Sequence, residues 1–352
     1  MPSVSILIPH HAGIHHLRPL FLSLLKLWRE QIDVEFVLVD NGSSDGSVPF
    51  VRKHFPAVRI LSLGENQGFA PALNYAARQV ESEWLCFLNN DVRVDPDWLW
   101  NLMLAVRTID SVCFSSHILD WDARQTTFAG GWVNLFGKGF ESTRLQGEQP
   151  YQIFFPCGCG TLIKREVFLQ AGGFDDEYFM IYEDVDLGWR LRLLGYTTWF
   201  VPDAFIMHHA HASLNKLSYS KKALFFERNS LATIYKNLEM QNLSILLPLA
   251  IQENLLRARA VSGTGIPFRY RSEGQAILQA VRTFLSKLEL WREKRNWIQR
   301  NRQVSDSELL QQFFPHPGQM WAFNEEHYHR IHHPSVKHEL EAVYGKALEI
   351  MK

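Results

Sequence analysis

The sequence lacks three things: a net charge, an abundance of cysteine and a long apolar run. Its 36 Lys and Arg are balanced by 37 Asp and Glu, so the formal net charge of -1 supplies no general attraction to nucleic acid or to a membrane. Among its four cysteines, Cys157 and Cys159 are too close in sequence for an ordinary disulfide and lack the second pair that a zinc site needs. No apolar run approaches the ~20 residues that span a bilayer, and no basic flank typical of a signal peptide precedes the first apolar segment. We therefore expect a cytoplasmic protein that is soluble or peripheral to a membrane.

With 352 residues, the chain is long enough for one large domain and one smaller one. Its first half alternates apolar, β-branched segments with segments of helical periodicity, which predicts βαβ units and an α/β fold with a largely parallel sheet. The expected strands are 3–8, 35–39, 58–61 and 84–88, and the expected helices are 17–28, 70–81 and 96–107. From about residue 110 to 156, Gly and aromatic residues with weak periodicity predict irregular strands.

The character of the chain changes after about residue 212, where we expect helices with a basic bias. We accordingly predict a catalytic domain at 1–211 and a helical region at 212–352. Residues 257–302 carry eleven Lys and Arg against three Glu, a local net charge of +8. Apolar residues at spacings of three and four from Ile277 to Trp291, with Trp297 beyond, predict a basic amphipathic helix there. Such a helix either packs on its own domain with a solvated outer face or docks on an anionic membrane surface.

Polar residues gather in the loops that follow consecutive predicted strands. Asp40 and Asn41 follow the second strand, and Asn66-Gln67-Gly68 follows the third strand and precedes a helix. Open α/β sheets bind ligands at the carboxyl ends of their strands, so Asp40 is well placed to accept hydrogen bonds from a base or ribose. The amides at the start of the helix can face a phosphate. An Asx turn at Asp40 and an ordinary turn with a helix cap at 66–68 remain alternatives.

The loop after the fourth predicted strand is Leu88-Asn-Asn-Asp-Val92. An acid directly after a buried strand is a good oxygen ligand for Mg²⁺ or Mn²⁺, and such a metal can bridge a nucleotide diphosphate and offset the charge of the leaving group. We predict Asp91 as this ligand. Asp95 is instead expected to cap the helix that begins near Pro96.

Residues 172–196 hold six carboxylates in a segment otherwise rich in aromatic and aliphatic residues. Burying a carboxylate costs free energy unless a metal, a cation or a substrate hydroxyl satisfies it, so the segment is either a solvated turn or part of an active site. We favour the active site. Within the segment, Asp186 is expected to pair with Arg190 one helical turn later.

Five motifs occur in a fixed order along the chain: Val39–Ser47, Asn66–Ala70 with Asn74, Leu88–Asp91, Gly172–Asp175 and Glu183–Leu187. This order resembles that of family 2 glycosyltransferases, most of all the rhamnosyltransferase-like branch, and the match covers roughly residues 3–230. The resemblance implies a GT-A fold, a nucleotide diphosphate sugar such as dTDP-rhamnose as donor, a divalent metal, and inversion at the anomeric carbon.

The same resemblance assigns roles to residues of the donor site. Asp40 is similar to the acid that binds the base and ribose, and Asp91 to the last acid of the metal-binding Asp-x-Asp motif, whose first acid is replaced here by Asn89. Arg228 resembles the arginine of the Arg-Asn segment that closes the site, and it can pair with a phosphate. The complete set of predicted donor-binding residues is Pro9, Asp40, Asn41, Asn66, Gly68, Asn74, Asn90, Asp91 and Arg228.

On the acceptor side, the resemblance makes Asp184 the general base and Glu183 a neighbour that tunes it. A single carboxylate suffices for in-line displacement with inversion, and a nearby acid can raise its pKa towards a useful range. His208 ends an apolar run, where the family often places a metal-binding histidine, so we predict it as the second metal ligand; a purely structural role is the alternative. His209 and His211 are expected to face the acceptor or the diphosphate, and the histidine cluster at 327–333 to form a solvated surface.

The sequence therefore predicts a metal-dependent, inverting glycosyltransferase that extends a cell-surface polysaccharide or a lipid-linked glycan and binds no nucleic acid. Two alternatives remain. A sugar nucleotidyltransferase would share the nucleotide, the metal and the sheet, but the first strand is not followed by its Gly-x-Gly-Thr-Arg loop. A non-catalytic glycan-binding protein on the same fold is disfavoured because Asp40, Asp91, Asp184 and His208 are all present.

Overall fold

The computed structural model describes residues 1–27, 31–209, 217–261, 268–313 and 334–349. The chain divides into two compact units. The first unit comprises residues 1–131, 141–192 and 196–212, and the second comprises 132–140, 193–195 and 213–352. Each unit is described by itself below.

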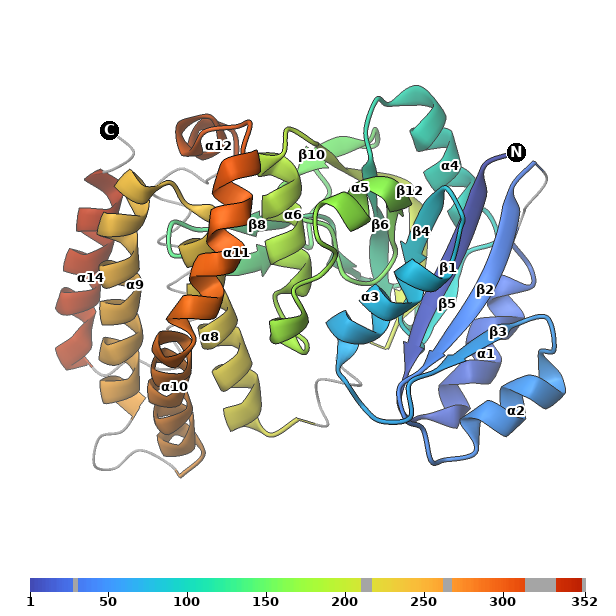
Figure 1. The fold of residues 1–352 in the computed structure, drawn as a ribbon, viewed down its shortest axis with the longest axis horizontal. Helices are drawn as coiled ribbons and strands as arrows, with labels where there is room; N and C mark the ends of the chain where they lie inside the picture. The colour runs from blue at the N-terminus through green and yellow to red at the C-terminus, as the bar shows by residue number, and fades with distance from the viewer. Residues whose placement is uncertain (28–30, 210–216, 262–267, 314–333, 350–352) are drawn as a thin grey trace. The chain divides into compact units, whose positions relative to one another are not determined.

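A ten-stranded mixed sheet forms the centre of the first unit (Figure 1). Its main strands lie in the spatial order β10-β12-β6-β11-β4-β1-β2-β3, while β5 pairs with β12 and β7 pairs with β6. The strands are β1 Ser3–His10, β2 Asp33–Asp40, β3 Arg59–Ser62, β4 Trp84–Phe87, β5 Val92–Val94, β6 Cys113–Asp120, β7 Thr126–Phe128, β10 Tyr151–Ile153, β11 Thr161–Lys164 and β12 Thr198–His208. Most residues of the strands β1, β2, β4, β6 and β11 are buried, so these strands are covered on both faces.

The register of the sheet brings several strand ends to one edge. Strands β1, β2, β3 and β4 are parallel, with His10 opposite Asp40 and Asp40 opposite Ser62. In the other half of the strand order, β12 runs parallel to β6 and antiparallel to β5. The pairing with β5 places His208 opposite Val92. The residue before Val92 is Asp91, so the pairing of β5 with β12 carries two distant parts of the sequence to one place.

Helices cover the sheet through apolar faces at helical spacing (Figure 1). In α1, the buried residues Leu17, Leu20, Phe21 and Leu24 form one such face. Helix α3 packs on β1 and β2, and α4 packs on β12 and β6. The helices of this unit are α1 Ile14–Leu24, α2 Ser47–His54, α3 Phe69–Gln79, α4 Trp98–Thr108, α5 Arg165–Gln170 and α6 Glu183–Leu193, with a 3-10 turn at Asp176–Tyr178.

These elements agree with the α/β alternation that the sequence predicts, with one clear error. Residues 113–120 form β6, a long and regular strand of the main sheet, where only irregular strands were expected. Ser115, Ser116 and His117 interrupt its apolar pattern, but all three are buried and hydrogen-bonded. Ser116 Oγ, for example, donates to Gly160 O at 2.6 Å and accepts from Trp98 Nε1 at 2.8 Å. Buried polar groups with partners are tolerated in a core strand, and periodicity alone does not detect them.

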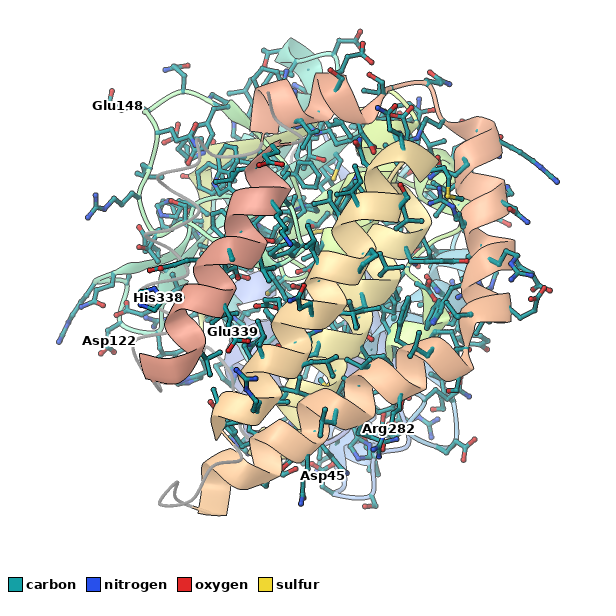
Figure 2. The ribbon with its side chains drawn as sticks, turned by 90° about the vertical axis from the view of Figure 1, so that its left-hand side faces the viewer. Asp45, Asp122, Glu148, Arg282, His338 and Glu339 are labelled. Atoms are coloured by element: carbon teal, nitrogen blue, oxygen red, sulfur yellow. The ribbon has the colours of Figure 1, made fainter. Side chains whose placement is uncertain are left out.

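Helices make up most of the second unit, and α9 and α14 lie side by side in it (Figure 2). They are α8 Tyr219–Asn237, α9 Met240–Val261, α10 Phe268–Ser286, α11 Leu288–Asn301, α12 Asp306–Phe313 and α14 Pro334–Leu348. A short ribbon of β8 Gly131–Val133 and β9 Gly139–Glu141 contributes residues 132–140. Within the described ranges, no helix is both long and apolar enough to cross a bilayer.

The single basic amphipathic helix predicted within 257–302 is instead two helices, α10 and α11. The chain turns at Lys287, whose φ of -110° and ψ of 17° are not helical. Trp291 explains the break, because its indole is buried and its Nε1 donates to Phe284 O at 3.2 Å across the turn. The predicted apolar face is real in part: Ile277, Val281 and Phe284 are buried.

A buried ion network lies in the second unit. Lys138 Nζ donates to Glu227, and Arg257 Nη1 donates to the other oxygen of Glu227 at 2.5 Å. Glu253, which is fully buried, lies 3.9 Å from Lys138 and 3.8 Å from Arg257. Two cations therefore balance the charge of two carboxylates, and such pairing offsets the cost of burying charged groups.

Candidate active site

Asp91 and His208 lie together at the sheet edge, as predicted for a pair of metal ligands. His208 Nε2 is 3.1 Å from Asp91 Oδ1 and 3.2 Å from Asn89 Nδ2. The backbone supports the pair from both sides, since β5 pairs with β12 and His209 N donates to Asp91 O at 3.0 Å. Asp91 is only 3 % exposed, so its carboxylate is held in a fixed and largely dry position.

The chemistry of these residues fits a divalent cation. A carboxylate oxygen and an imidazole nitrogen are ligands that Mn²⁺ accepts, and Mg²⁺ favours the oxygen. Asn89, whose Nδ2 contacts His208, has a buried Oδ1 without a hydrogen-bonding partner among the described residues. The described part of the chain holds no cluster of three or more His, Cys, Asp or Glu side chains that could bind a metal by themselves. A cation here would therefore take further ligands from a substrate.

The Asp40 side chain stabilises its own loop, as the turn alternative requires, although its hydrogen bond reaches the amide three residues on and not two. Ser43 N donates to Asp40 Oδ1 at 2.9 Å, and the carboxylate is 7 % exposed. The turn engages one carboxylate oxygen at the carboxyl end of β2. The turn and a ligand-binding role are therefore compatible at this residue.

Asn41 and Asn66 hold the neighbouring loop in shape. Asn41 Nδ2 donates to Asn66 Oδ1 at 3.1 Å and to Gly68 O at 2.9 Å, while Gln67 N donates to Asn41 Oδ1 at 2.8 Å. The side chain of Asn41 is thus occupied by the protein. It fixes the loop after β3 against the loop after β2, and a direct contact of Asn41 or Asn66 with a nucleotide stays a prediction.

The first amides of α3 have a partner within the protein, so the contact with a phosphate that was predicted for residues 66–68 stays a prediction. Phe69 N and Ala70 N both donate to Phe179 O, at 2.6 and 3.3 Å. Gly68 makes this possible with a φ of 102°, and a Cβ there would lie 2.6 Å from Phe179 O. A carbonyl oxygen from the acid-rich segment accepts hydrogen bonds from these amides, so Gly68 joins the loop after β3 to that segment.

Asn74 likewise ties α3 to the acid-rich segment. Its Nδ2 donates to Phe174 O at 2.7 Å and to Asp176 Oδ1 at 2.5 Å, and Phe174 N donates to its Oδ1 at 2.9 Å. With 2 % exposure, this side chain is a buried clamp. Pro9 is half-buried in β1, one residue before the strand ends. Nucleotide contacts of Asn74 and Pro9 stay predictions.

Glu183 and Asp184 begin α6 and face the turn at Gly158. Gly158 N donates to Asp184 Oδ2 at 3.0 Å, and Val185 N donates to Asp184 Oδ1 at 2.8 Å. A Cβ at Gly158 would lie 3.4 Å from Glu183 Oε1 and 3.5 Å from Asp184 Oδ2, so both carboxyl groups lie beside this residue. The absence of a side chain at 158 leaves room next to the pair.

The two carboxyl groups differ in their hydrogen bonding. Burial, and then repulsion from Asp184, raise the pKa of Glu183 well above its ordinary value. Burial also raises the pKa of Asp184, but the amides of Gly158 and Val185 oppose this by stabilising its carboxylate. Glu183 Oε2 has no hydrogen-bonding partner among the described residues. Backbone amides of Glu183 and Ile181 also stabilise the Glu183 carboxylate, but burial and the repulsion from Asp184 outweigh them, so Glu183 is the group of the pair that favours a proton.

Comparison with known proteins decides the family. The profile described as glycosyl transferase family 2 matches residues 5–171. The N-acetylglucosaminyl-diphospho-decaprenol L-rhamnosyltransferase of Mycobacterium tuberculosis is 32% identical over 224 residues, covering 55% of this chain and 72% of the relative. The chain belongs to glycosyltransferase family 2. Rhamnosyltransferase WbbL of Escherichia coli is 27% identical over 177 residues, covering 46% of this chain and 66% of that protein.

The family 2 enzyme has the GT-A fold that the sequence predicts. A crystal structure of GalNAc-T7 with UDP, GalNAc and Mn²⁺ matches 82% of this chain and 57% of that chain, with a TM-score of 0.57 and 15% sequence identity. At this identity the likeness concerns the fold alone. The prediction of a glycosyltransferase is confirmed, and the alternative of a sugar nucleotidyltransferase is left without support.

The pairing of Asp186 with Arg190 is confirmed in the family 2 enzyme. Arg190 Nε donates to Asp186 Oδ2 at 2.8 Å, and its other nitrogens donate to Ala171 O and Gly173 O. Asp175 Oδ1 accepts from Glu177 N at 3.1 Å and so caps a short turn. Asp176, in turn, accepts from Asn74. These three acids of the segment have structural partners, whereas Glu183 and Asp184 are the two that lie beside Gly158.

Other predicted residues have different outcomes. Arg228 belongs to the second unit, where its Nε donates to Asn229 Oδ1 at 2.8 Å and its guanidinium lies over the ring of Phe225; its pairing with a phosphate stays a prediction. The ring of His209 stacks on Trp121 with 3.7 Å between centroids. His211 and the cluster at 327–333 lie outside the described residues.

Two residues near the site were not predicted from sequence. Glu141, at the end of β9, lies close enough to Asp184 for the two carboxylates to repel each other. It comes from the weakly patterned stretch 110–156, which offers no signal that this acid meets another one. His10, at the end of β1, contacts Asn90, whose donor-binding role was predicted.

Proposed function

We propose that this enzyme transfers rhamnose from a nucleotide diphosphate sugar, with inversion, to a lipid-linked or glycan acceptor in the synthesis of a cell-surface polysaccharide. The observation that carries the proposal is the pair of carboxyl groups of Glu183 and Asp184, which lies beside Gly158 and has no ion-pair partner among the described residues. The names of the mycobacterial and Escherichia coli relatives support rhamnose as the sugar, and the first of them supports a lipid-linked acceptor.

The acid pair suits the removal of a proton from an acceptor hydroxyl. A hydroxyl is a poor nucleophile at neutral pH, and a carboxylate within hydrogen-bonding reach takes its proton as the new bond forms. Asp184 accepts that proton. The acceptor oxygen bonds to the anomeric carbon, the bond from that carbon to the diphosphate oxygen breaks, and the electron pair leaves with the nucleotide diphosphate. One displacement of this kind inverts the anomeric centre.

The donor side is the sheet edge with Asp40 and Asp91. Asp40 is placed to bind the base and ribose, as the end of a central parallel strand is in an open α/β sheet. Asp91 and His208, with Asn89 beside them, would hold Mg²⁺ or Mn²⁺. Such a cation would offset the negative charge of the diphosphate as it leaves.

Nucleotide titration tests the donor assignment. The purified protein is titrated with dTDP, UDP and GDP by calorimetry, with and without MnCl₂. We expect dTDP to bind most tightly and Mn²⁺ to strengthen its binding. If none of the three nucleotides binds under either condition, the donor site proposed here does not exist.

Transfer is tested with dTDP-[¹⁴C]rhamnose and membranes that contain lipid-linked N-acetylglucosamine. We expect label in the lipid fraction and dTDP in the aqueous phase. UDP-sugars tested in parallel identify the donor class. Transfer from a UDP-sugar alone would refute rhamnose while leaving the glycosyltransferase assignment intact.

We further propose that the helices α10 and α11 contact an anionic membrane at the cytoplasmic face. Arg282, Arg292 and Arg300 are exposed on them, and Leu285 and Trp297 are 46% and 41% exposed (Figure 2 labels Arg282). Cations and an exposed indole are the groups that bind headgroups and the membrane interface. Co-sedimentation with vesicles rich in phosphatidylglycerol is expected at low salt and not with phosphatidylcholine vesicles. Equal recovery in both supernatants would contradict it.

A further inference from the structure

His10 is a buried histidine at the end of β1 that the proposed chemistry does not use. It is only 2 % exposed, and both of its ring nitrogens have partners. Nδ1 lies 2.6 Å from Asn90 Nδ2, and Nε2 lies 2.7 Å from Ser47 Oγ. Burial lowers the pKa of His10 to about 4, so the ring is neutral at physiological pH.

The chemistry of the partners fixes the direction of these hydrogen bonds. The Nδ2 group of Asn90 only donates, so His10 Nδ1 accepts and the single ring proton is on Nε2. His10 Nε2 therefore donates to Ser47 Oγ, and the Ser47 hydroxyl donates to the carboxylate of Asp45. The other oxygen of Asp45 accepts from Gly13 N at 2.7 Å and from Ile14 N at the start of α1.

This chain of hydrogen bonds joins the loops on the donor side. Asn90 is the neighbour of Asp91, in the loop after β4. Ser47 is the first residue of α2 and ends the loop that Asp40 begins after β2. His10 lies between them and stands opposite Asp40 in the sheet register. One imidazole therefore bonds to both the nucleotide-side loop and the metal-side loop.

We propose that His10 is a positioning residue that couples the two loops, so that divalent-cation binding at Asp91 and nucleotide binding at Asp40 strengthen each other. The inference rests on the proposed donor site and extends it. Since coupling between two sites is reciprocal, Mn²⁺ raises nucleotide affinity by the same factor by which the nucleotide raises Mn²⁺ affinity. Part of that factor is direct contact between ligands, and part is the shared positioning of the loops through His10.

The test measures this factor instead of turnover. Calorimetry gives the Kd of dTDP with and without saturating MnCl₂, and electron paramagnetic resonance gives the Kd of Mn²⁺ with and without dTDP. In His10→Phe, we expect the dTDP affinity without metal to change less than about threefold and the Mn²⁺-dependent enhancement to fall about tenfold, which corresponds to ~1.4 kcal/mol of coupling free energy. Ser47→Ala, which breaks one link and keeps Asn90 paired, is expected to lose a smaller part.

His117 offers a matched control. It is also a buried histidine, 8 % exposed, and its ring nitrogens contact Pro202 O at 3.0 Å and Thr126 Oγ1 at 2.9 Å. Burial lowers its pKa as well, but it lies on β6, away from the β1, β2 and β4 loops. His117→Phe is expected to lower thermal stability to a similar degree and to leave the enhancement by Mn²⁺ unchanged.

The outcomes separate this inference from the function it rests on. An undiminished enhancement in His10→Phe, or an equal loss in His117→Phe, overturns the role of His10 while the donor site stands. If the wild-type protein binds dTDP without any effect of Mn²⁺, both the metal assignment and the coupling fail. If His10→Phe does not fold by circular dichroism, Ser47→Ala carries the test, and an unchanged enhancement in that variant overturns the inference.

Discussion

Two buried acidic sites in this enzyme have opposite electrostatics. Glu227, in the helical unit, is 2 % exposed, and Glu183, at the start of α6, is 8 % exposed. Burial alone would raise the pKa of both. Arg257 and then Lys138 outweigh burial at Glu227 and hold its pKa well below the ordinary range, whereas at Glu183 the neighbouring charge is Asp184, and the pKa rises.

The comparison shows that the partner, not burial, separates a structural acid from a functional one. Two cations neutralise Glu227 and anchor the ribbon of Lys138 to α8 and α9. No described cation compensates the carboxyl pair of α6, which is costly for the folded protein and useful for moving a proton. The ion network at Glu227 therefore stabilises the folded protein, whereas the acid pair of α6 destabilises it.

The largest effect is expected for Asp184→Asn. The amide cannot accept the acceptor proton, so kcat should fall about 10³-fold, as expected for loss of a general base. The Kd of dTDP in the presence of Mn²⁺ should stay within a few-fold of wild type, because Asp184 lies on the acceptor side. Steady-state transfer and calorimetry measure the two quantities.

Asp186→Asn is the matched control for that variant. It removes a carboxylate two residues away on the same helix and breaks the pair with Arg190, so it should lower thermal stability and not remove the base. Turnover per folded molecule that falls as far in Asp186→Asn as in Asp184→Asn would contradict the assignment of Asp184.

The next effect concerns stability at the paired acid. Glu227→Gln leaves Lys138 and Arg257 buried without their shared carboxylate, and we expect a loss of about 3–5 kcal/mol in the free energy of unfolding at pH 7. Chemical denaturation followed by circular dichroism measures it. A change below about 1 kcal/mol would show that the network contributes nothing as an ion pair.

Glu183→Gln should instead stabilise the folded protein, and this gain in stability should grow with pH. Below the ordinary glutamic acid pKa of about 4.3, Glu183 is protonated in both the folded and the unfolded chain and has no pH-dependent effect. Above that pH the unfolded chain releases the proton while the folded protein retains it, so wild type loses stability until the raised folded-state pKa is passed. Glutamine does not titrate. We expect the variant to gain on the order of 2 kcal/mol over wild type between pH 5 and 8.

Thermal melts of both proteins from pH 5 to 8 measure this difference. Glu227→Gln, scanned in parallel, should be destabilised by nearly the same amount at pH 5 and at pH 8, because the stability that a depressed pKa gives is present above the unfolded value and is lost only as pH falls below it. If the difference in stability between wild type and Glu183→Gln is constant over this range, Glu183 does not retain a proton in the folded protein.

The smallest effect is expected for Gly158→Ala. The new methyl group would lie 3.4 Å from Glu183 Oε1 and 3.5 Å from Asp184 Oδ2, a distance that the fold tolerates. Stability should change by less than about 1 kcal/mol. The KM of the acceptor should nevertheless rise several-fold, because the methyl group narrows the space beside the base. An unchanged KM would place the acceptor hydroxyl elsewhere.

Much of the fold follows from the sequence, because β1, β2 and β4 and the helices between them have clean periodicity. Strand β6 does not follow, since Ser115, Ser116 and His117 hide a buried strand whose hydrogen-bonding partners come from other segments. The break at Lys287 is also a tertiary effect, fixed by the burial of Trp291. The local sequence pattern predicts which face of a strand or helix is buried, but it does not identify the segment that packs against that face.

The sequence names candidate site residues, but it does not predict the contacts that these residues make within the protein. Asp91 and His208 were expected together as metal ligands from the family resemblance, and the structure brings them together through the pairing of β5 with β12, which the sequence did not predict. Asn74 and Gly68 were expected at the nucleotide, and the structure occupies them with the segment at Phe174–Phe179. The distinction between Glu183 and Glu227 depends on residues far away in sequence, so composition and spacing carry no sign of it.

Infrared difference spectroscopy tests the central comparison most directly. A protonated carboxyl group has a C=O stretching band that a carboxylate lacks. At pH 7, we expect this band in the wild-type protein and its loss in Glu183→Gln, whereas Glu227→Gln should leave the band in place. If the band is absent from wild type, or if it disappears with Glu227 and not with Glu183, the acid pair is not the uncompensated site proposed here.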